Sequence, residues 1–281
     1  MDDFDTTVHE NVRAALSEDI GHDDLTARLV ADDAMADAQV VCRQAAVLCG
    51  RPWFDETFKQ VDPGVDIEWN TTEGETVTAD VTVCRIHGRA RSVLTAERTA
   101  LNFLQTLSGT ATAAHQYAEA IAGTGARVLD TRKTVPGLRV AQKYAVRCGG
   151  CHNHRMGLYD AILIKENHIR SAGSITAAVM AAREQGSAVP VEVEIEELSQ
   201  LNEVLDAGVD VVMLDNFSMA DMQLAVRQNR DHRPPARLEA SGDVSLQTIR
   251  AIAETGVDFI SVGSLTKHVR AIDLSLLFLA S

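Results

Sequence analysis

The stretch VEVEIEELSQLNEVLDAGVDVVMLDN, residues 191–216, decides the fold. Its two ends, VEVEI at 191–195 and VVMLD at 211–215, have the length and the β-branched content of strands. Between them, apolar residues recur at helical spacing up to Gly208, the residue type that closes a helix in the left-handed conformation. A strand, a helix and a strand with short connections predict neighbouring strands of a parallel sheet.

The same pattern recurs through the second part of the chain. The predicted strands are RVLDT (127–131), AILIK (161–165), VEVEI (191–195), VVMLD (211–215), RLEAS (237–241) and FISVG (259–263). Helical segments between them end at Gly186, Gly208 and Gly256. Six strands alternating with helices predict an α/β barrel of the TIM type.

The first third of the chain has a different pattern. Apolar spacing predicts helices over 5–19 and 51–61, the second opened by Pro52, and a long helix over 95–122. The segments 38–49 and 64–94 alternate apolar and polar residues, as half-buried strands do. This region is therefore predicted to be a smaller domain of mixed helices and strands.

Composition indicates a globular enzyme of the cytoplasm. The chain is 46% hydrophobic and 23% charged, and no apolar run is long enough to cross a bilayer. Its first ten residues, MDDFDTTVHE, are acidic and lack the apolar core of a secretory signal. A formal net charge of −14 argues against nucleic acids or anionic membranes as partners.

The charge is unevenly distributed. Residues 127–170 contain nine lysines and arginines against three acids, a local charge of +6, so the remainder of the chain carries −20. A basic segment in an acidic protein favours a pocket for a small, highly anionic ligand.

The sequence CGGCHNHR at 148–155 permits other interpretations. The spacing C-x-x-C-H attaches c-type haem, and two cysteines with two histidines could bind zinc. Haem attachment of this kind follows export, and structural zinc sites usually draw ligands from two separated pairs. We therefore expect no haem and no zinc, and five scattered cysteines that remain free thiols.

Functional side chains follow the predicted strands where each one ends. They are Thr131, Arg132 and Lys133, then Lys165, Asp215, Ser241 with Gly242, and Gly263 with Ser264. Because the active site of a βα barrel lies at the carboxyl ends of its strands, we expect these residues to meet. The alternating strand at 191–196 would direct its carboxylates inward, placing Glu194 with Asp215 opposite the basic segment.

This set of residues suits two anionic ligands. Arginines and lysines bind carboxylates and phosphates, and glycine turns offer backbone N–H groups to phosphate. Two carboxylates can hold Mg²⁺ against a diphosphate, directly or through water. The predicted ligands are a phosphorylated sugar and a partner with several carboxylates.

The segment DTRKTVPGLRVAQKYAVRCGGCHNHRMGLYDAILIKENHI, residues 130–169, closely resembles the signature of quinolinate phosphoribosyltransferases. The resemblance extends over nearly the whole chain through further collinear motifs, among them ALSEDIGHDDLTA, TAERTALNFLQTLSGTAT, LEASGDVSL and FISVGSLT. It implies phosphoribosyl transfer from 5-phosphoribosyl 1-diphosphate to quinolinate with decarboxylation, which gives nicotinate mononucleotide, CO₂ and diphosphate in NAD biosynthesis, with Mg²⁺ as cofactor.

The resemblance also implies an architecture. An N-terminal α/β sandwich, residues 1–110, precedes an incomplete α/β barrel, residues 111–270, and the tail 271–281 packs back on the first domain. The family works as a homodimer with sites shared between subunits. The sequence does not decide whether such dimers associate into higher oligomers.

Site residues follow from the resemblance position by position. Arg98 matches an arginine that reaches quinolinate from the neighbouring subunit, and Lys133 lies where both substrates meet. Catalytic roles fall on Lys133, Glu194 and Asp215, and the two acids also surround the ribose and its metal. The groups expected around the substrate carboxylates are Arg132, His154, Arg155 and Lys165, and those expected around the 5-phosphate are Ser241, Gly242, Asp243, Gly263 and Ser264.

Three alternatives stay open from the residues alone. An aldolase-like barrel would use Lys165 as a Schiff-base nucleophile, and a nicotinate phosphoribosyltransferase would need fewer cations. A haem or zinc protein would place its ligands in 148–155.

Overall fold

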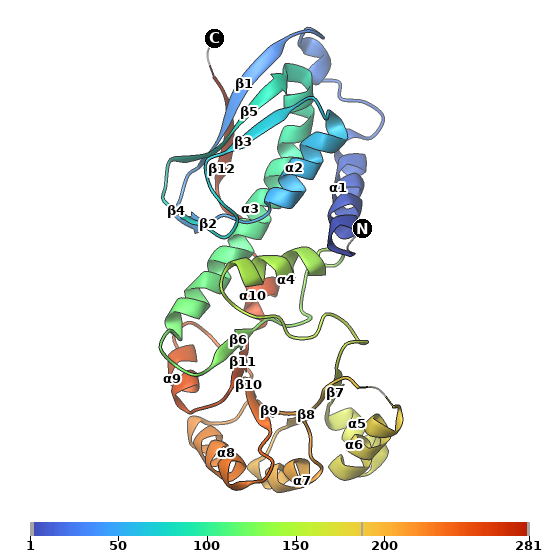
Figure 1. Cartoon of the computed structure of the whole chain (residues 1–281), viewed down its shortest axis with the longest axis vertical. Coiled ribbons are helices and arrows are strands. Elements are labelled where there is room, and N and C mark those ends of the chain that lie inside the picture. Colours follow the sequence, from blue (N-terminus) through green and yellow to red (C-terminus); the bar gives the residue numbers. More distant parts are fainter. Residues whose placement is uncertain (1–2, 187, 280–281) are drawn as a thin grey trace. The chain divides into compact units, whose positions relative to one another are not determined.

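The computed structural model describes residues 3–186 and 188–279 (Figure 1). Its residues separate into two compact units, the first comprising Met1–His115, Thr134–Gly150 and Leu265–Ser281, and the second Gln116–Lys133 and Cys151–Ser264. No helix in the described ranges combines the length and the hydropathy needed to span a membrane.

The first unit is built on a four-stranded antiparallel sheet. Its strands, in spatial order, are β12 (Leu274–Phe278), β1 (Met35–Cys42), β5 (Val81–Arg89) and β3 (Asp66–Trp69). The last strand of the chain pairs with the first, from Ala38 opposite Phe278 to Cys42 opposite Leu274. A second, two-stranded sheet joins β2 (Ala46–Val47) to β4 (Thr76–Val77).

Helices complete this unit (Figure 1). They are α1 (Asp3–Ile20), the 3₁₀ turn η1 (Ala27–Leu29), α2 (Arg51–Val61), the part of α3 (Ala90–Ala120) up to His115, α4 (Arg139–Cys148) and the start of the tail segment in α10 (Ser264–Lys267). The helix predicted over 51–61 is confirmed with its proline in the first turn. The long helix, however, begins at Ala90 rather than 95, so the predicted strand over 64–94 was wrong for its last residues. Ala90, Val93 and Ala96 are buried at helical spacing, which extends the apolar stripe of α3 backward.

Two apolar clusters hold the first unit together. One packs the antiparallel sheet against α3, with Leu101 and Leu104 at most 1% exposed. The other gathers α1, α2, α3 and α4 around three aromatic rings, in which Phe4 lies 5.5 Å from Trp53 and 5.1 Å from Tyr144 between centroids. Because Tyr144 belongs to this aromatic cluster, the segment 134–150 packs with the first unit. The boundary expected near residue 110 stays a prediction.

The second unit is a six-stranded parallel sheet. In spatial order its strands are β6 (Arg127–Leu129), β11 (Phe259–Ser261), β10 (Arg237–Ser241), β9 (Val211–Asp215), β8 (Val191–Ile195) and β7 (Ile162–Ile164). Within the described residues no strand pairing joins β6 to β7, so the barrel is incomplete. The predicted fold class, an α/β protein with an N-terminal sheet domain and an incomplete barrel, is confirmed.

Helices connect the strands along the outer side of this sheet (Figure 1). They are α5 (Glu166–Ala172), α6 (Ile175–Glu184), the turn η2 (Leu198–Gln200), α7 (Leu201–Asp206), α8 (Met219–Asp231) and α9 (Ile249–Glu254). The predicted glycine ends of three helices are confirmed, since Gly186, Gly208 and Gly256 have φ values of 67°, 70° and 96°. Short connections of this kind bring the carboxyl ends of all six strands to one edge.

Candidate active site

A cavity of about 490 Å³ opens at the carboxyl ends of the parallel strands. Nine of the predicted site residues line it, together with Leu163, Met213 and Ser261. The nine are Thr131, Arg132, Lys133, His154, Arg155, Lys165, Glu194, Asp215 and Ser241. They come from five of the six strands of the sheet or from the connections that follow them, and Ser261 adds the sixth, although in the sequence the nine span more than a hundred residues.

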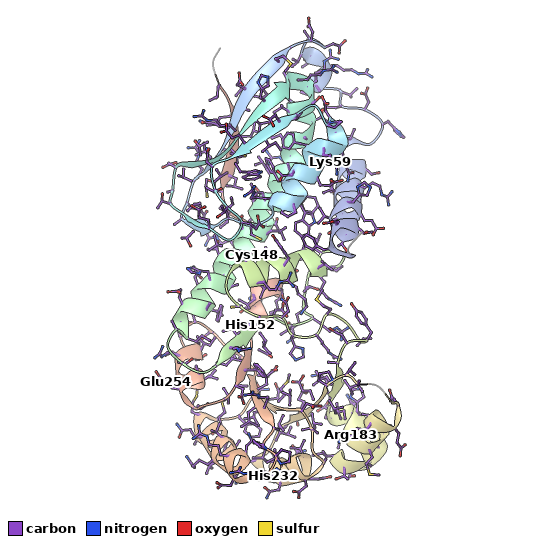
Figure 2. The ribbon with its side chains drawn as sticks, in the orientation of Figure 1. Lys59, Cys148, His152, Arg183, His232 and Glu254 are labelled. Atoms are coloured by element: carbon purple, nitrogen blue, oxygen red, sulfur yellow. The ribbon has the colours of Figure 1, made fainter. Side chains whose placement is uncertain are left out.

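A buried aspartate organises the loop that supplies His154 and Arg155. Asp130, which is 0% exposed, accepts hydrogen bonds from the backbone N–H of His154 at 2.9 Å and from Nδ2 of Asn153 at 2.6 Å. The backbone N–H of Asp130 in turn donates to the carbonyl of His152. His152 itself, labelled in Figure 2, is exposed. The segment between α4 and β7 is therefore fixed to the end of β6 so that residues 154 and 155 line the cavity.

The positive charges of Arg132 and Arg155 lie close enough to affect each other. Burial lowers the pKa of Arg155, and the charge of Arg132 lowers it further, whereas Glu192 and Asp160 oppose the shift. Nη1 of Arg155 donates to the carbonyl of Ala161 at 3.2 Å, which orients its guanidinium. Like charges held this close favour the binding of an anion.

The acidic side consists of Glu194 and Asp215 on neighbouring strands. Glu194 pairs in register with Met213, so Asp215 follows two residues further along β9. Oε2 of Glu194 forms an ion pair with Nζ of Lys165. The next carboxyl group in the sequence belongs to exposed Glu196, just after β8. Its pKa is raised, first by Glu166 and then by the negative charges of Asp215 and Glu194. Several carboxylates at this rim therefore repel one another, which is the environment that a divalent cation relieves.

Gly242 has a backbone that only glycine readily adopts. Its φ is +103°, and a Cβ there would collide with the side chain of Asn216. Asn216 donates from Nδ2 to Asp215 at 2.8 Å and from its backbone N–H to the carbonyl of Ser241 at 2.9 Å. The turn after β10 thus packs directly on the residue that follows β9. Asn216 stands at the end of a predicted strand beside Asp215, but it is not among the predicted site residues.

The other predicted phosphate-loop residues lie beside the cavity rather than among its lining. A Cβ on Gly263 would lie 3.2 Å from Cδ of Lys133, so this backbone touches the lysine. The hydroxyl of Ser264 lies 3.2 Å from that of Tyr117, and Asp243 is exposed with a φ of 34°.

Arg98 belongs to the first unit. It lies on α3 with a side chain 59% exposed, and its guanidinium is 3.8 Å from the carboxylate of Glu97. Its predicted contact with a substrate of another subunit stays a prediction.

The two cysteines of CGGCHNHR lie in different environments. Cys148, labelled in Figure 2, is in the first unit, where its Sγ lies within 4.8 Å of Sγ of Cys49 and of a carboxylate oxygen of Glu73. Cys151 is buried in the second unit, and burial raises the pKa of its thiol to about 12. The two glycines also differ: Gly150 makes the turn with a φ of 89°, whereas a Cβ on Gly149 would collide with the backbone of Ala111 on α3.

Comparisons with known proteins agree with this geometry. Two family models match, the quinolinate phosphoribosyl transferase N-terminal domain over residues 23–108 and its C-terminal domain over residues 110–277. A probable nicotinate-nucleotide pyrophosphorylase (carboxylating) of Synechocystis is 42% identical over 262 residues, 93% of this chain and 89% of the relative. The nicotinate-nucleotide pyrophosphorylase (carboxylating) of Mycobacterium leprae is 39% identical over 98% of both chains.

A solved structure is similar throughout. The nicotinate-nucleotide pyrophosphorylase of Francisella tularensis superposes with a TM-score of 0.94 at 48% identity, covering 98% of this chain and 97% of that one.

Fold, cavity and relatives together define a phosphoribosyltransferase of the incomplete-barrel type. The chain belongs to the quinolinate phosphoribosyl transferase family. It is a decarboxylating pentosyltransferase, which transfers the phosphoribosyl group to quinolinate in de novo NAD synthesis and yields nicotinate mononucleotide, CO₂ and diphosphate.

Proposed function

We propose that the cavity at the strand ends binds quinolinate on its cationic side and the phosphoribosyl diphosphate on its acidic and glycine-bearing side. The observation that supports this most directly is the composition of one lining: two arginines and two lysines line the same cavity of about 490 Å³ as two carboxylates. A ligand with two carboxylates suits the arginines and lysines. A sugar that carries phosphates and a bound cation suits the two carboxylates.

Quinolinate binds among Arg132, His154, Arg155 and Lys165. The arginines offer planar, bidentate donors to its carboxylates. The mutual repulsion of Arg132 and Arg155, which lowers the pKa of Arg155, is relieved when an anion lies between them. Arg132 and Arg155 thereby position the pyridine ring, and its nitrogen points toward the sugar.

Glu194 and Asp215 hold Mg²⁺, directly or through water. Carboxylate oxygens are the ligands that Mg²⁺ prefers, and the raised pKa of Glu196 reflects carboxylates at this rim that a cation would neutralise. When bound, the ion neutralises charge on the departing diphosphate.

The 5-phosphate binds at the two glycine turns, Ser241–Asp243 and Gly263–Ser264. Backbone N–H groups in such turns form a concave anion site without adding side-chain bulk. The contact of Gly263 with Lys133 brings this turn beside a lysine that lines the cavity.

The reaction follows from these positions. As the bond from C1 of the ribose to diphosphate breaks, positive charge grows on the sugar, and the carboxylates of Glu194 and Asp215 stabilise it. The pyridine nitrogen attacks C1 because both substrates are held in line. The ring nitrogen then carries a positive charge, which stabilises the electron pair that stays on C2 as CO₂ departs. A proton completes C2, and Lys133 and Lys165 are the cations placed to stabilise this carbanion.

The active enzyme is a homodimer in which Arg98 of one subunit completes the quinolinate site of the other. The exposure of Arg98 supports this arrangement, since only a weak contact with Glu97 engages its guanidinium among the ion pairs of the described residues. A ligand with two carboxylates also needs cations on each side of it.

The cytoplasm is the proposed compartment. All five cysteines are free thiols in this structure, as a reducing environment requires.

The amide variants Glu194→Gln and Asp215→Asn test the assignment of the two acids. Each should lower kcat by about a hundredfold or more, because a carboxylate that stabilises developing charge is lost. The Kd of quinolinate, measured by calorimetry, should change less than about threefold. Glu254→Gln, the same change at an exposed helix position in the same unit, should behave as the unmodified enzyme. Unchanged kcat in either site variant would contradict the assignment.

A further inference from the structure

A buried cluster of two glutamates and a histidine lies under the cationic side of the cavity. Nε2 of His154 is 3.0 Å from Oε2 of Glu192 on β8 and 3.6 Å from Oε1 of Glu239 on β10. The side chains of the two acids are 6% and 2% exposed. The hydroxyl of Ser261 on β11, which also lines the cavity, hydrogen-bonds to Glu239. None of the roles proposed above uses either glutamate.

The hydrogen bonds fix which nitrogen of His154 carries its proton. The backbone N–H of Arg155 donates to Nδ1 at 2.8 Å, so Nδ1 is an acceptor and holds no proton. The proton of the neutral ring is therefore on Nε2, directed at Glu192 and Glu239. Both ring nitrogens are engaged within the protein, one with the acids and one with the backbone of Arg155. His154 thus connects the buried acids to the arginine that faces the substrate.

Two carboxylates cannot both be ionised cheaply in one buried site. Burial raises the pKa of Glu239 to about 8, with the charge of Glu192 as the second cause, while His154 and Ser261 oppose the shift. Oε1 of Glu192 is also buried and accepts no hydrogen bond within the part of the chain that the structure describes. Glu239 therefore keeps its proton to a higher pH than an exposed glutamate does.

We propose that Glu192 and Glu239 are positioning residues of the quinolinate site, which hold His154, and through it Arg155. This inference rests on the proposed binding of quinolinate among the cations above them. While Glu239 keeps its proton, it leaves intact the positive potential that draws in a dicarboxylate. Loss of that proton adds a negative charge beneath the cations and weakens this potential.

The groups that face Glu239 come from three elements. They are Glu192 from β8, His154 from the loop between α4 and β7 and the hydroxyl of Ser261 from β11, and the register partner on β9 is uncharged Met213. The backbone N–H of Arg155 donates to the other nitrogen of His154. A change of charge on Glu239 is therefore transmitted to quinolinate through His154 and Arg155.

The test measures the Kd of quinolinate by calorimetry and KM and kcat by assay, each from pH 6.5 to 9.5. In the unmodified enzyme, Kd and KM should rise by about tenfold through pH 8 as Glu239 loses its proton and becomes negatively charged. The change in kcat should be smaller. Glu239→Gln keeps the shape of the acid but cannot ionise, so this rise should disappear. Glu254→Gln should retain it.

Two milder variants should shift the pH at which Kd and KM rise, in opposite directions. Glu192→Gln removes the charge that raises the pKa of Glu239, so the rise should move to lower pH. Ser261→Ala removes a hydrogen bond that lowers that pKa, so the rise should move to higher pH. A folded Glu239→Gln enzyme with the original rise, or displacement of the two milder variants in the same direction, would overturn the proposal. If instead quinolinate fails to bind the unmodified enzyme at any pH, the proposed function itself is wrong.

Discussion

At the scale of single residues, Gly242 is the position where the backbone leaves least freedom. A Cβ at a φ of +103° is strained, and it would collide with the side chain of Asn216. Because Asn216 is hydrogen-bonded to Asp215, relief of that collision displaces a residue of the acidic side.

Gly242→Ala should therefore weaken the apparent affinity for the phosphoribosyl donor, with KM about tenfold higher, and lower the free energy of unfolding by about 1–3 kcal/mol. Steady-state kinetics and denaturant unfolding measure the two effects. Gly125→Ala is the matched control, since a Cβ there meets no atom within 4 Å. Equal behaviour of the two variants would show that the turn tolerates a side chain.

Single residues also show where sequence reasoning stops. Arg132, Lys165 and Asp215 could be predicted because each lies at or just beyond the carboxyl end of a strand, and strand ends share one edge. Glu239 could not, since a glutamate within RLEAS gives no sign that it is 1% exposed beside a histidine from another loop. Ser261 was likewise hidden, because its contact with Glu239 depends on the pairing of β11 with β10.

At the scale of elements, periodicity predicted the strands of the barrel well. The bounds expected for 191–195, 211–215 and 237–241 are those observed, because each segment has the length of a strand and is bounded by turns. The junction of β5 and α3 was displaced by five residues, from 95 to Ala90. Alternation and helical spacing overlap over a few residues, and burial of Val93 decides between them.

The helix α4 shows a different limit. Its residues, Arg139–Cys148, are not among the helices expected from the sequence, and local spacing does not show which core receives it. The rings of Phe4, Trp53 and Tyr144 bring it to the first unit, and Phe4 lies 140 residues before Tyr144 in the chain. Contacts over such separations follow from packing, which local patterns do not encode.

At the scale of the whole molecule, the proposed dimer makes the function of one chain depend on another. Arg98→Ala should abolish activity while the protein stays folded and dimeric, as circular dichroism and light scattering would show. Lys133→Ala should also be inactive. Mixing the two should restore part of the activity, because a hybrid dimer contains one site with both residues intact. If labelled subunits are seen to exchange and no activity returns, the shared site is wrong.

The central claim is that one cavity couples phosphoribosyl transfer to decarboxylation. The measurement that tests it most directly supplies the protein with Mg²⁺, 5-phosphoribosyl 1-diphosphate and quinolinate, and follows CO₂ and diphosphate together. We expect one CO₂ and one diphosphate for each quinolinate consumed, and no CO₂ when the phosphoribosyl donor is omitted. Release of CO₂ without the donor, or of diphosphate without CO₂, would contradict the account.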